Sequence, residues 1–277
     1  MKNNITVIVD NKSQIGLKNE HGLAIHIEYN GKRILFDNGQ NKEALFYNAE
    51  QLNIPLTNLD FIILSHGHYD HSGNLDTLLK FNPSAHFYAH PDCLQTRYSL
   101  HPNKAPHTIS IKPNILKSLA EFPETQKHFI TDVTEISPGI WLTGQIPRIA
   151  NDEDTGGPFF LDTDKKQLDL LNDDMSLWLD TEEGIAVICG CCHAGIINTL
   201  THIKQQRPSG TNITLLLGGL HLVNANKRRI DATIDYLNKQ PINTIYPAHC
   251  TGDNAMDLLQ QYCTNVQTAK AGLTLLF

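Results

Sequence analysis

Apolar residues in the first ninety positions gather in short runs that predict strands followed by helices. The expected strands are Ile5–Val9, Leu23–Tyr29, Arg33–Phe36, Phe61–Leu64 and Ala85–Ala89. The pair Asn30-Gly31 between the second and third runs predicts a tight hairpin. Helices are expected from about Asn41 to Leu52 and from about Ser72 to Phe81. The run Phe61–Leu64 has no polar alternation, which is typical of a strand covered on both faces.

The last third of the chain repeats this pattern of strands followed by helices. A hairpin is expected from Ser176–Asp180 and Ile185–Cys189 across Glu182-Glu183-Gly184. Three strands (Ile213–Leu217, Thr244–Tyr246, Gly272–Leu276) then alternate with helices at about 195–206, 227–239 and 255–263. Paired strands followed by strand–helix alternation at both ends of the chain predict two sheets with helices outside.

The middle of the chain is harder to interpret, because eight of the 13 prolines lie between Pro91 and Pro158. We expect one domain over residues 1–277, with a proline-rich insertion or cap at about 91–158 and some helix near Ile115–Phe122. Long irregular segments in compact proteins are often functional lids, so both a lid and a plain surface excursion stay open.

Composition and charge narrow the class of protein. The 277 residues are 40% hydrophobic and 18% charged, an ordinary globular balance, and the net charge of -7 argues against nucleic-acid binding. No apolar run approaches the roughly 20 residues of a membrane span, and the run Ile5–Val9 is too short for a signal-peptide core. We therefore expect a cytoplasmic protein with no membrane partner. The oligomeric state stays open, and a homo-oligomer is one alternative.

The segment His66-x-His68-x-Asp70-His71 carries the strongest chemical signal. Four metal-binding side chains fall within six residues, after a buried strand and before a helix. Open α/β sheets place their sites at such strand ends. Imidazole and carboxylate together suit zinc, iron or manganese, so the segment predicts a transition-metal site.

Three more histidines follow the same local order of apolar strand, tight turn, histidine and helix. They are His193, His221 and His249. Each alone is as easily a loop histidine as a ligand, but together with the first motif they predict distant ligands, with His221 the weakest candidate. Cys191, Cys192 and Cys250 adjoin these histidines; a thiolate binds zinc, yet we favour small packing residues, and no disulfide framework is expected.

The segment from Ser65 to Gly73 closely resembles the signature loop of the metallo-β-lactamase superfamily, and Phe36-Asp37-Asn38-Gly39 resembles its preceding strand-end aspartate. The resemblance spans about Ile5 to Leu276 apart from the middle. It implies an α+β fold, an αβ/βα four-layer sandwich of two central mixed β-sheets with helices outside. It also implies that His66, His68 and His193 bind a first metal, that Asp70, His71 and His249 bind a second, and that Asp37 orients the loop by hydrogen bonds.

One departure concerns the acid that bridges the two metals in many hydrolases of the superfamily. The corresponding strand end here is Gly218-Gly219-Leu220-His221, with no acid. His221 is therefore expected either to replace the bridge or to contact substrate, and occupancy by two metals stays open.

The segments around His193, His221 and His249 (Gly190–Gly195, Gly218–Leu222 and Pro247–Gly252) resemble one subgroup of the superfamily. This subgroup is the 7,8-dihydropterin-6-yl-methyl-4-(β-D-ribofuranosyl)aminobenzene 5′-phosphate synthase-like proteins. The resemblance implies a small phosphorylated substrate, pterin- or aminobenzoate-like.

We accordingly expect a hydrolase or transferase that acts on a small molecule through metal-activated water, with one or two divalent ions. Zinc is favoured, with manganese or iron as alternatives, and Asp70 either holds the second metal or passes a proton. Arg97, Tyr98 and Arg148 are the candidate substrate contacts, with His101, Lys104, His107 and Lys112 beside them in sequence. The rival hypotheses are an iron-containing oxygen or redox module and a catalytically silent, metal-bound ligand sensor.

Overall fold

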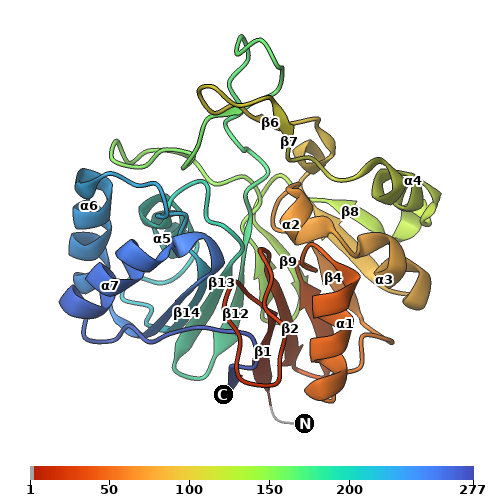
Figure 1. Cartoon of the computed structure of the whole chain (residues 1–277). Helices are drawn as coiled ribbons and strands as arrows, with labels where there is room; N and C mark the ends of the chain where they lie inside the picture. The colour runs from red at the N-terminus through yellow and green to blue at the C-terminus, as the bar shows by residue number, and fades with distance from the viewer. Residues whose placement is uncertain (1–2) are drawn as a thin grey trace.

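The computed structural model describes residues 3–277 and has four layers. Two large sheets pack face to face in the middle, and helices cover the outer face of each (Figure 1). This is the αβ/βα sandwich that the sequence predicted.

The first sheet has seven strands in the order β16-β1-β2-β3-β4-β5-β8. The strands are β1 (Asn4–Val9), β2 (Ala24–Tyr29), β3 (Lys32–Phe36), β4 (Phe61–Ile63), β5 (His86–Ala89), β8 (Lys127–Phe129) and β16 (Thr274–Leu276). The β2–β3 hairpin turns at Asn30 and Gly31, both with positive φ, as their sequence predicted. From β3 to β8 the strands run parallel, so their carboxyl ends share one edge.

The second sheet has six strands in the order β15-β14-β13-β12-β10-β9. They are β9 (Thr134–Ser137), β10 (Ile140–Leu142), β12 (Ser176–Thr181), β13 (Gly184–Cys189), β14 (Ile213–Gly219) and β15 (Ile242–Ala248). The last three are parallel neighbours, which again brings three carboxyl ends to one edge.

Helices pack on both outer faces because each presents an apolar side to a sheet. The first sheet is covered by α1 (Lys42–Gln51), α3 (Leu75–Phe81) and α4 (Pro113–Glu121), and the second by α5 (Ile196–Gln205), α6 (Lys227–Asn238) and α7 (Asp253–Tyr262). Short 3-10 turns occur at Pro91–Leu94, Glu124–Gln126 and His249–Thr251.

The helix predicted from Ser72 to Phe81 is instead two helices, α2 (Tyr69–Ser72) and α3, with a break at Gly73 and Asn74. The loop after β3 causes the break. Asn38 accepts a hydrogen bond from the Asn74 backbone at 2.7 Å, and Gly73 donates to the Gly39 carbonyl at 2.8 Å. These bonds take the place of helical ones and fix α2 against the end of β3.

The proline-rich middle lies only partly outside the two sheets. Strands β8 and β9 form the edges of the first and second sheets, and β10 lies between β9 and β12, which the prediction of an insertion at 91–158 did not include. A separate small sheet, β11-β6-β7, forms from Tyr98–Ser99 (β6), His107–Thr108 (β7) and Phe159–Phe160 (β11). It lies above the edge of the large sheets in Figure 1. The backbone of the following residues, Ile109 and Ser110, pairs with Tyr69 and His68.

Three apolar layers hold the sandwich together, one between the sheets and one under each set of helices. Within residues 3–277, no helix combines the length and apolar character needed to cross a bilayer.

The inter-sheet layer should dominate stability. We expect Ile25→Ala, at a fully buried position between the sheets, to lower the free energy of unfolding by about 2–5 kcal/mol, because it leaves a cavity that neither sheet can fill. Ile15→Ala is the matched control, since Ile15 is fully exposed and its change should stay within about 0.5 kcal/mol. Urea unfolding of both variants measures the difference, and equal losses would contradict this assignment of the core.

Candidate metal centre

The predicted ligands come together because both sheets present carboxyl ends of strands at one edge. His66, His68, Asp70 and His71 lie in or just after the loop that follows β4. His193, His221 and His249 follow β13, β14 and β15 in turn. Residues almost two hundred positions apart thus meet below the small sheet.

Three imidazoles, those of His66, His68 and His193, form a first group. Their candidate ligand atoms lie within 4.8 Å of one another. All three residues are buried, and none of the three Nε2 atoms has a hydrogen-bond partner among the described residues. Burial holds the pKa of each imidazole well below its usual range. The rings are therefore neutral and offer lone pairs, the form in which histidine binds metal.

Asp70, His71 and His249 form a second group beside the first. The Nε2 atoms of His71 and His249 lie 3.8 and 3.4 Å from Asp70 Oδ2, and 3.3 Å from each other. Burial alone would raise the pKa of Asp70, but His71, His21 and His249 hold that pKa well below its usual range. Burial likewise opposes protonation of His71, yet the Asp37 and Asp70 carboxylates outweigh it and raise the pKa to about 9.

Asp37 lies behind both groups and is fully buried. Its carboxylate accepts hydrogen bonds from Ser65 N at 2.8 Å, Ser65 Oγ at 2.7 Å and His71 Nδ1 at 2.7 Å. Since the Ser65 hydroxyl donates to Asp37, it accepts from His66 Nδ1, 2.9 Å away. One carboxylate thus turns the Nε2 atoms of His66 and His71 toward the site, as the resemblance implied.

The other ring nitrogens are fixed in the same way by residues that sequence reasoning missed. His193 Nδ1 donates to the Thr155 carbonyl at 2.8 Å, which leaves its Nε2 as the lone-pair atom. His249 Nδ1 pairs with Asn11 Oδ1 at 2.8 Å, while its backbone N donates to Asp10. Asp10 and Asn11 directly follow β1, so the only signal in the sequence was their place at a strand end.

Two consecutive acids, Asp173 and Asp174, support the ligand loops from the second sheet. Asp173 accepts a hydrogen bond from Gly67 N, and Asp174 accepts one from Ala194 N, both at 2.8 Å. Burial raises the pKa of Asp174 to about 7. Sequence reasoning missed both residues, and their one signal was an acidic pair just before the buried strand β12.

The backbone is strained at several residues of the candidate metal centre and beside it. Asp37, Cys192, His221 and His249 all have φ between 46° and 58°, a region that non-glycine residues seldom adopt. Such outliers cluster at functional sites when the surrounding structure enforces them.

Two of the three predicted substrate contacts have other partners. Arg97 is fully buried, with Nη1 2.6 Å from Asp173 and Nε 3.0 Å from Asp169, so it supports the ligand loop and cannot reach a substrate. Arg148 Nη2 donates to the His193 carbonyl at 2.6 Å and therefore positions a ligand. The prediction for Arg97 was wrong because a sequence does not show which carboxylate a buried arginine meets, whereas a substrate contact of the half-buried Arg148 stays a prediction.

A cavity of about 340 Å³ opens onto the second group, within the size range of small-ligand pockets. Among residues 3–277, the third predicted contact, Tyr98, does not line it, but its neighbour Ser99 does. His101, Lys104 and His107 from the same segment also line the cavity, together with His68, Asp70 and His249. Phe159 and Tyr69 supply aromatic walls.

His221 lies beside His193, with ring centroids 4.1 Å apart, and its ring also faces Phe159. Its ligand atom falls within 4.8 Å of those of His193 and Cys191. It borders both the metal-binding groups and the cavity, so the two alternatives for this residue stay open.

Comparisons with known proteins agree with this arrangement. A family model described as a β-lactamase superfamily domain matches residues 32–138. The 7,8-dihydropterin-6-methyl-4-(β-D-ribofuranosyl)-aminobenzene-5′-phosphate synthase of Methanocaldococcus jannaschii is 31% identical over 276 residues, covering 93% of this chain and 90% of that protein. A crystal structure of a metal-dependent hydrolase of the β-lactamase superfamily is 28% identical, with a TM-score of 0.84 over 99% of this chain and 98% of that one. A diphosphatase of the PhnP family, 15% identical with a TM-score of 0.56 over 100% and 98% of the two chains, shares the fold.

The role of Asp37 leads to a prediction. We expect Asp37→Asn to weaken zinc binding about 10- to 100-fold, because an amide nitrogen cannot accept the hydrogen bonds from Ser65 and His71. Competition with a chelating indicator measures the affinity. Asp60→Asn is the matched control, since Asp60 accepts from Arg33 N at the opposite end of β4. Wild-type affinity in Asp37→Asn would remove Asp37 from the metal centre.

Proposed function

We propose a function from one premise, that this chain belongs to the metallo-β-lactamase superfamily. In this proposal the site binds one or two divalent transition-metal ions and hydrolyses or transfers a phosphoryl or related ester group of a small substrate. Zinc is the metal we favour, since imidazole and carboxylate ligands suit it.

One observation carries the proposal, the three buried Nε2 atoms of His66, His68 and His193. A buried polar atom without a partner costs free energy, and native proteins rarely leave three of them pointing at one place. A metal ion would satisfy all three. The ligand set also leaves room for a further ligand, as catalytic zinc sites do and closed structural sites do not.

A divalent ion bound there supplies a water of lowered pKa and polarises the substrate oxygen. The protein's own groups would do the rest. The Asp70 carboxylate lies 3.4 Å from His249 Nε2 and also lines the cavity, so it is placed to hold a metal or to accept a proton. The hydrogen bonds at Nδ1 of His66, His71, His193 and His249 would keep these rings from turning during the reaction.

The cavity supports a phosphorylated substrate. Lys104, His101 and His107 line it beside the metal-binding groups, and Asp70 is the one carboxylate among its lining residues within 3–277. Phe159 and Tyr69 would hold a planar ring. The name of the Methanocaldococcus relative includes a phosphate, a pterin and an aminobenzene. A substrate of that chemical class fits both the charge and the walls.

The metal requirement is tested by stripping and by substitution. Protein purified without chelator should contain one or two zinc, manganese or iron ions, and turnover of a generic phosphodiester should stop on stripping and return on reloading. His68→Ala should lose metal and at least about 100-fold in turnover, since it removes a candidate ligand. His86→Ala is the control, because His86 lies on β5 and pairs with His128.

Three results would redirect the proposal. A folded His68→Ala variant that kept both metal and turnover would refute the mechanism. Iron with visible absorption and no turnover would favour the oxygen or redox module. Bound metal without turnover of any phosphorylated compound would favour a ligand sensor.

The phosphate contact is tested separately. We expect Lys104→Met to raise the inhibition constant of inorganic phosphate about tenfold, because a charge-assisted hydrogen bond is lost. Lys112→Met is the matched control, since Lys112 belongs to the same segment, is exposed and does not line the cavity. Equal inhibition constants in the two variants would exclude Lys104 from the phosphate site.

A further inference from the structure

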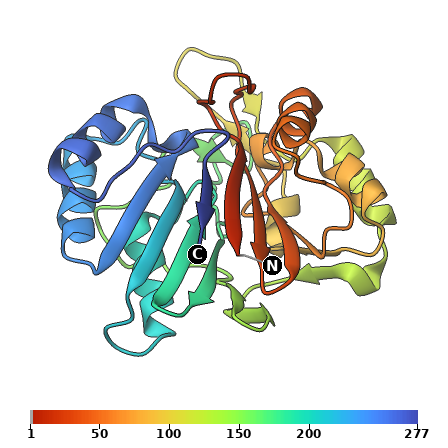
Figure 2. The same cartoon turned by 90° about the horizontal axis from the view of Figure 1, so that it is seen from below.

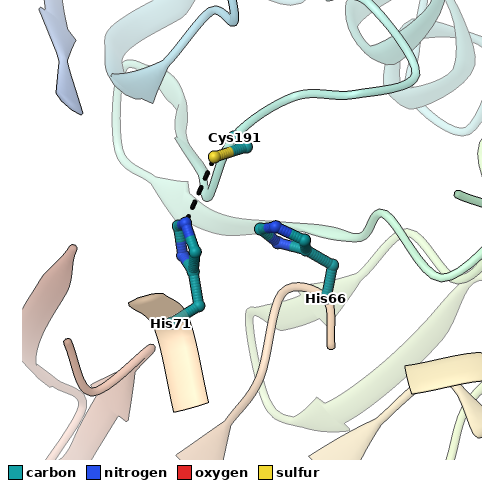
Figure 3. Close-up of side chains that lie close together, drawn as sticks. All are labelled: His66, His71 and Cys191. Carbon is teal, nitrogen blue, oxygen red and sulfur yellow. Dashed lines mark hydrogen bonds between the residues drawn. The ribbon is translucent and has the colours of Figure 1, made fainter. Parts of the chain in front are cut away.

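Cys191 lies between the two groups of candidate ligands. It directly follows Gly190 at the end of β13 and is buried. Its Sγ is 3.1 Å from His71 Nε2, and Figure 3 shows it facing His71 and His66 from the opposite sheet. The loop after β13 thus places a thiol where the two sheets meet.

Three sets of neighbouring ligand atoms share this one sulfur. Cys191 lies within 4.8 Å of His66 and His71, of His193 and His221, and of His249 and Cys250. His66 and His193 belong to the first group, whereas His71 and His249 belong to the second. A single atom close to both groups has the position of a bridge.

The last two residues of β14, the strand beside β13, have no room for the side chain of a bridging acid. A side chain at Gly218 would begin 2.1 Å from the Cys189 carbonyl oxygen, and one at Gly219 would begin 2.5 Å from Cys250 Sγ. No residue with a Cβ fits either position without moving the backbone. Packing therefore excludes an acid from Gly218 and Gly219, and the two residues that follow are leucine and histidine, so a protein anion between the metals would come from another element.

We propose that Cys191, as a thiolate, is a ligand shared by the two metal ions, in the place of a bridging carboxylate. This inference rests on the proposed metal-dependent function. The thiol gives up its proton to solvent when the ions bind, and no electron is transferred. A buried thiolate is stable only beside positive charge, which two divalent ions supply.

Cys192 offers a matched control in the next position. It is also fully buried, but it packs in the layer under α5 and its Sγ lies 3.3 Å from Thr199 Oγ1. Cys250 is the competing thiol, since it shares one of the three sets with Cys191.

The test is titration of metal-free protein with cobalt(II) under anaerobic conditions. Visible d–d bands report cobalt binding by any ligand, and a near-ultraviolet sulfur-to-cobalt band reports a thiolate ligand. We expect wild-type, Cys192→Ser and Cys250→Ser to bind two cobalt ions with both signals. Cys191→Ser should lose the sulfur band and bind the second ion more than about 100-fold more weakly, a loss above that of an outer partner. Cys191→Asp should recover the second ion without the sulfur band.

Other outcomes overturn the inference in distinguishable ways. Two results would exclude Cys191 as a thiolate ligand and leave the proposed metal site standing. One is cobalt binding without a sulfur band in the wild type, and the other is a sulfur band that survives in Cys191→Ser. Loss of the band only in Cys250→Ser assigns the thiolate to Cys250. No cobalt binding at all removes both the inference and the proposed function. If Cys191→Ser does not fold, zinc-edge X-ray absorption of the wild type decides, with sulfur at about 2.3 Å expected and its absence contrary.

Discussion

The carboxylate of Asp37 accepts three hydrogen bonds in a place that no water reaches, and the geometry of the site depends on it. It joins the end of β3 to the loop after β4 and to α2. Without it, two imidazoles would be free to turn away from the centre. Asp37 adopts a strained positive φ, and this backbone conformation directs its carboxylate toward both Ser65 and His71.

Supporting contacts of this kind come from every part of the chain. Asp10 and Asn11 follow β1, Thr155 lies in the middle segment, and Asp173 and Asp174 precede β12. Each fixes one ring nitrogen or one backbone amide of a ligand loop. These contacts order the imidazole cluster, because among its rings the structure has only the hydrogen bond between His71 and His249 within residues 3–277.

The pattern of apolar runs along the chain was sufficient to predict two sheets with helices outside. The place of the histidines at the ends of the predicted strands was sufficient to name them as candidate ligands. Phe61–Leu64 had to be a covered strand, and the histidines after it had to lie at the edge of a sheet. The partners of Arg97 and Arg148 could not be predicted, since Asp169 and the His193 carbonyl approach only in the folded chain. The same limit applies to the cysteines. Cys191 and Cys192 are equally apolar and adjacent, and the positive φ at Cys192 decides which of them faces the site.

The pairing of β1 with β16 has a consequence for how the molecule is made. Thr6 and Thr274 are register partners and contact each other across 268 positions of sequence, and Figure 2 shows the two strands side by side. During synthesis β1 has no partner on one side until β16 leaves the ribosome, because β16 is the last strand of the chain. Contacts of such long range close slowly. A chain that has not yet paired β16 leaves β1 as an unpaired edge strand, whose free backbone groups can pair with a strand of another chain.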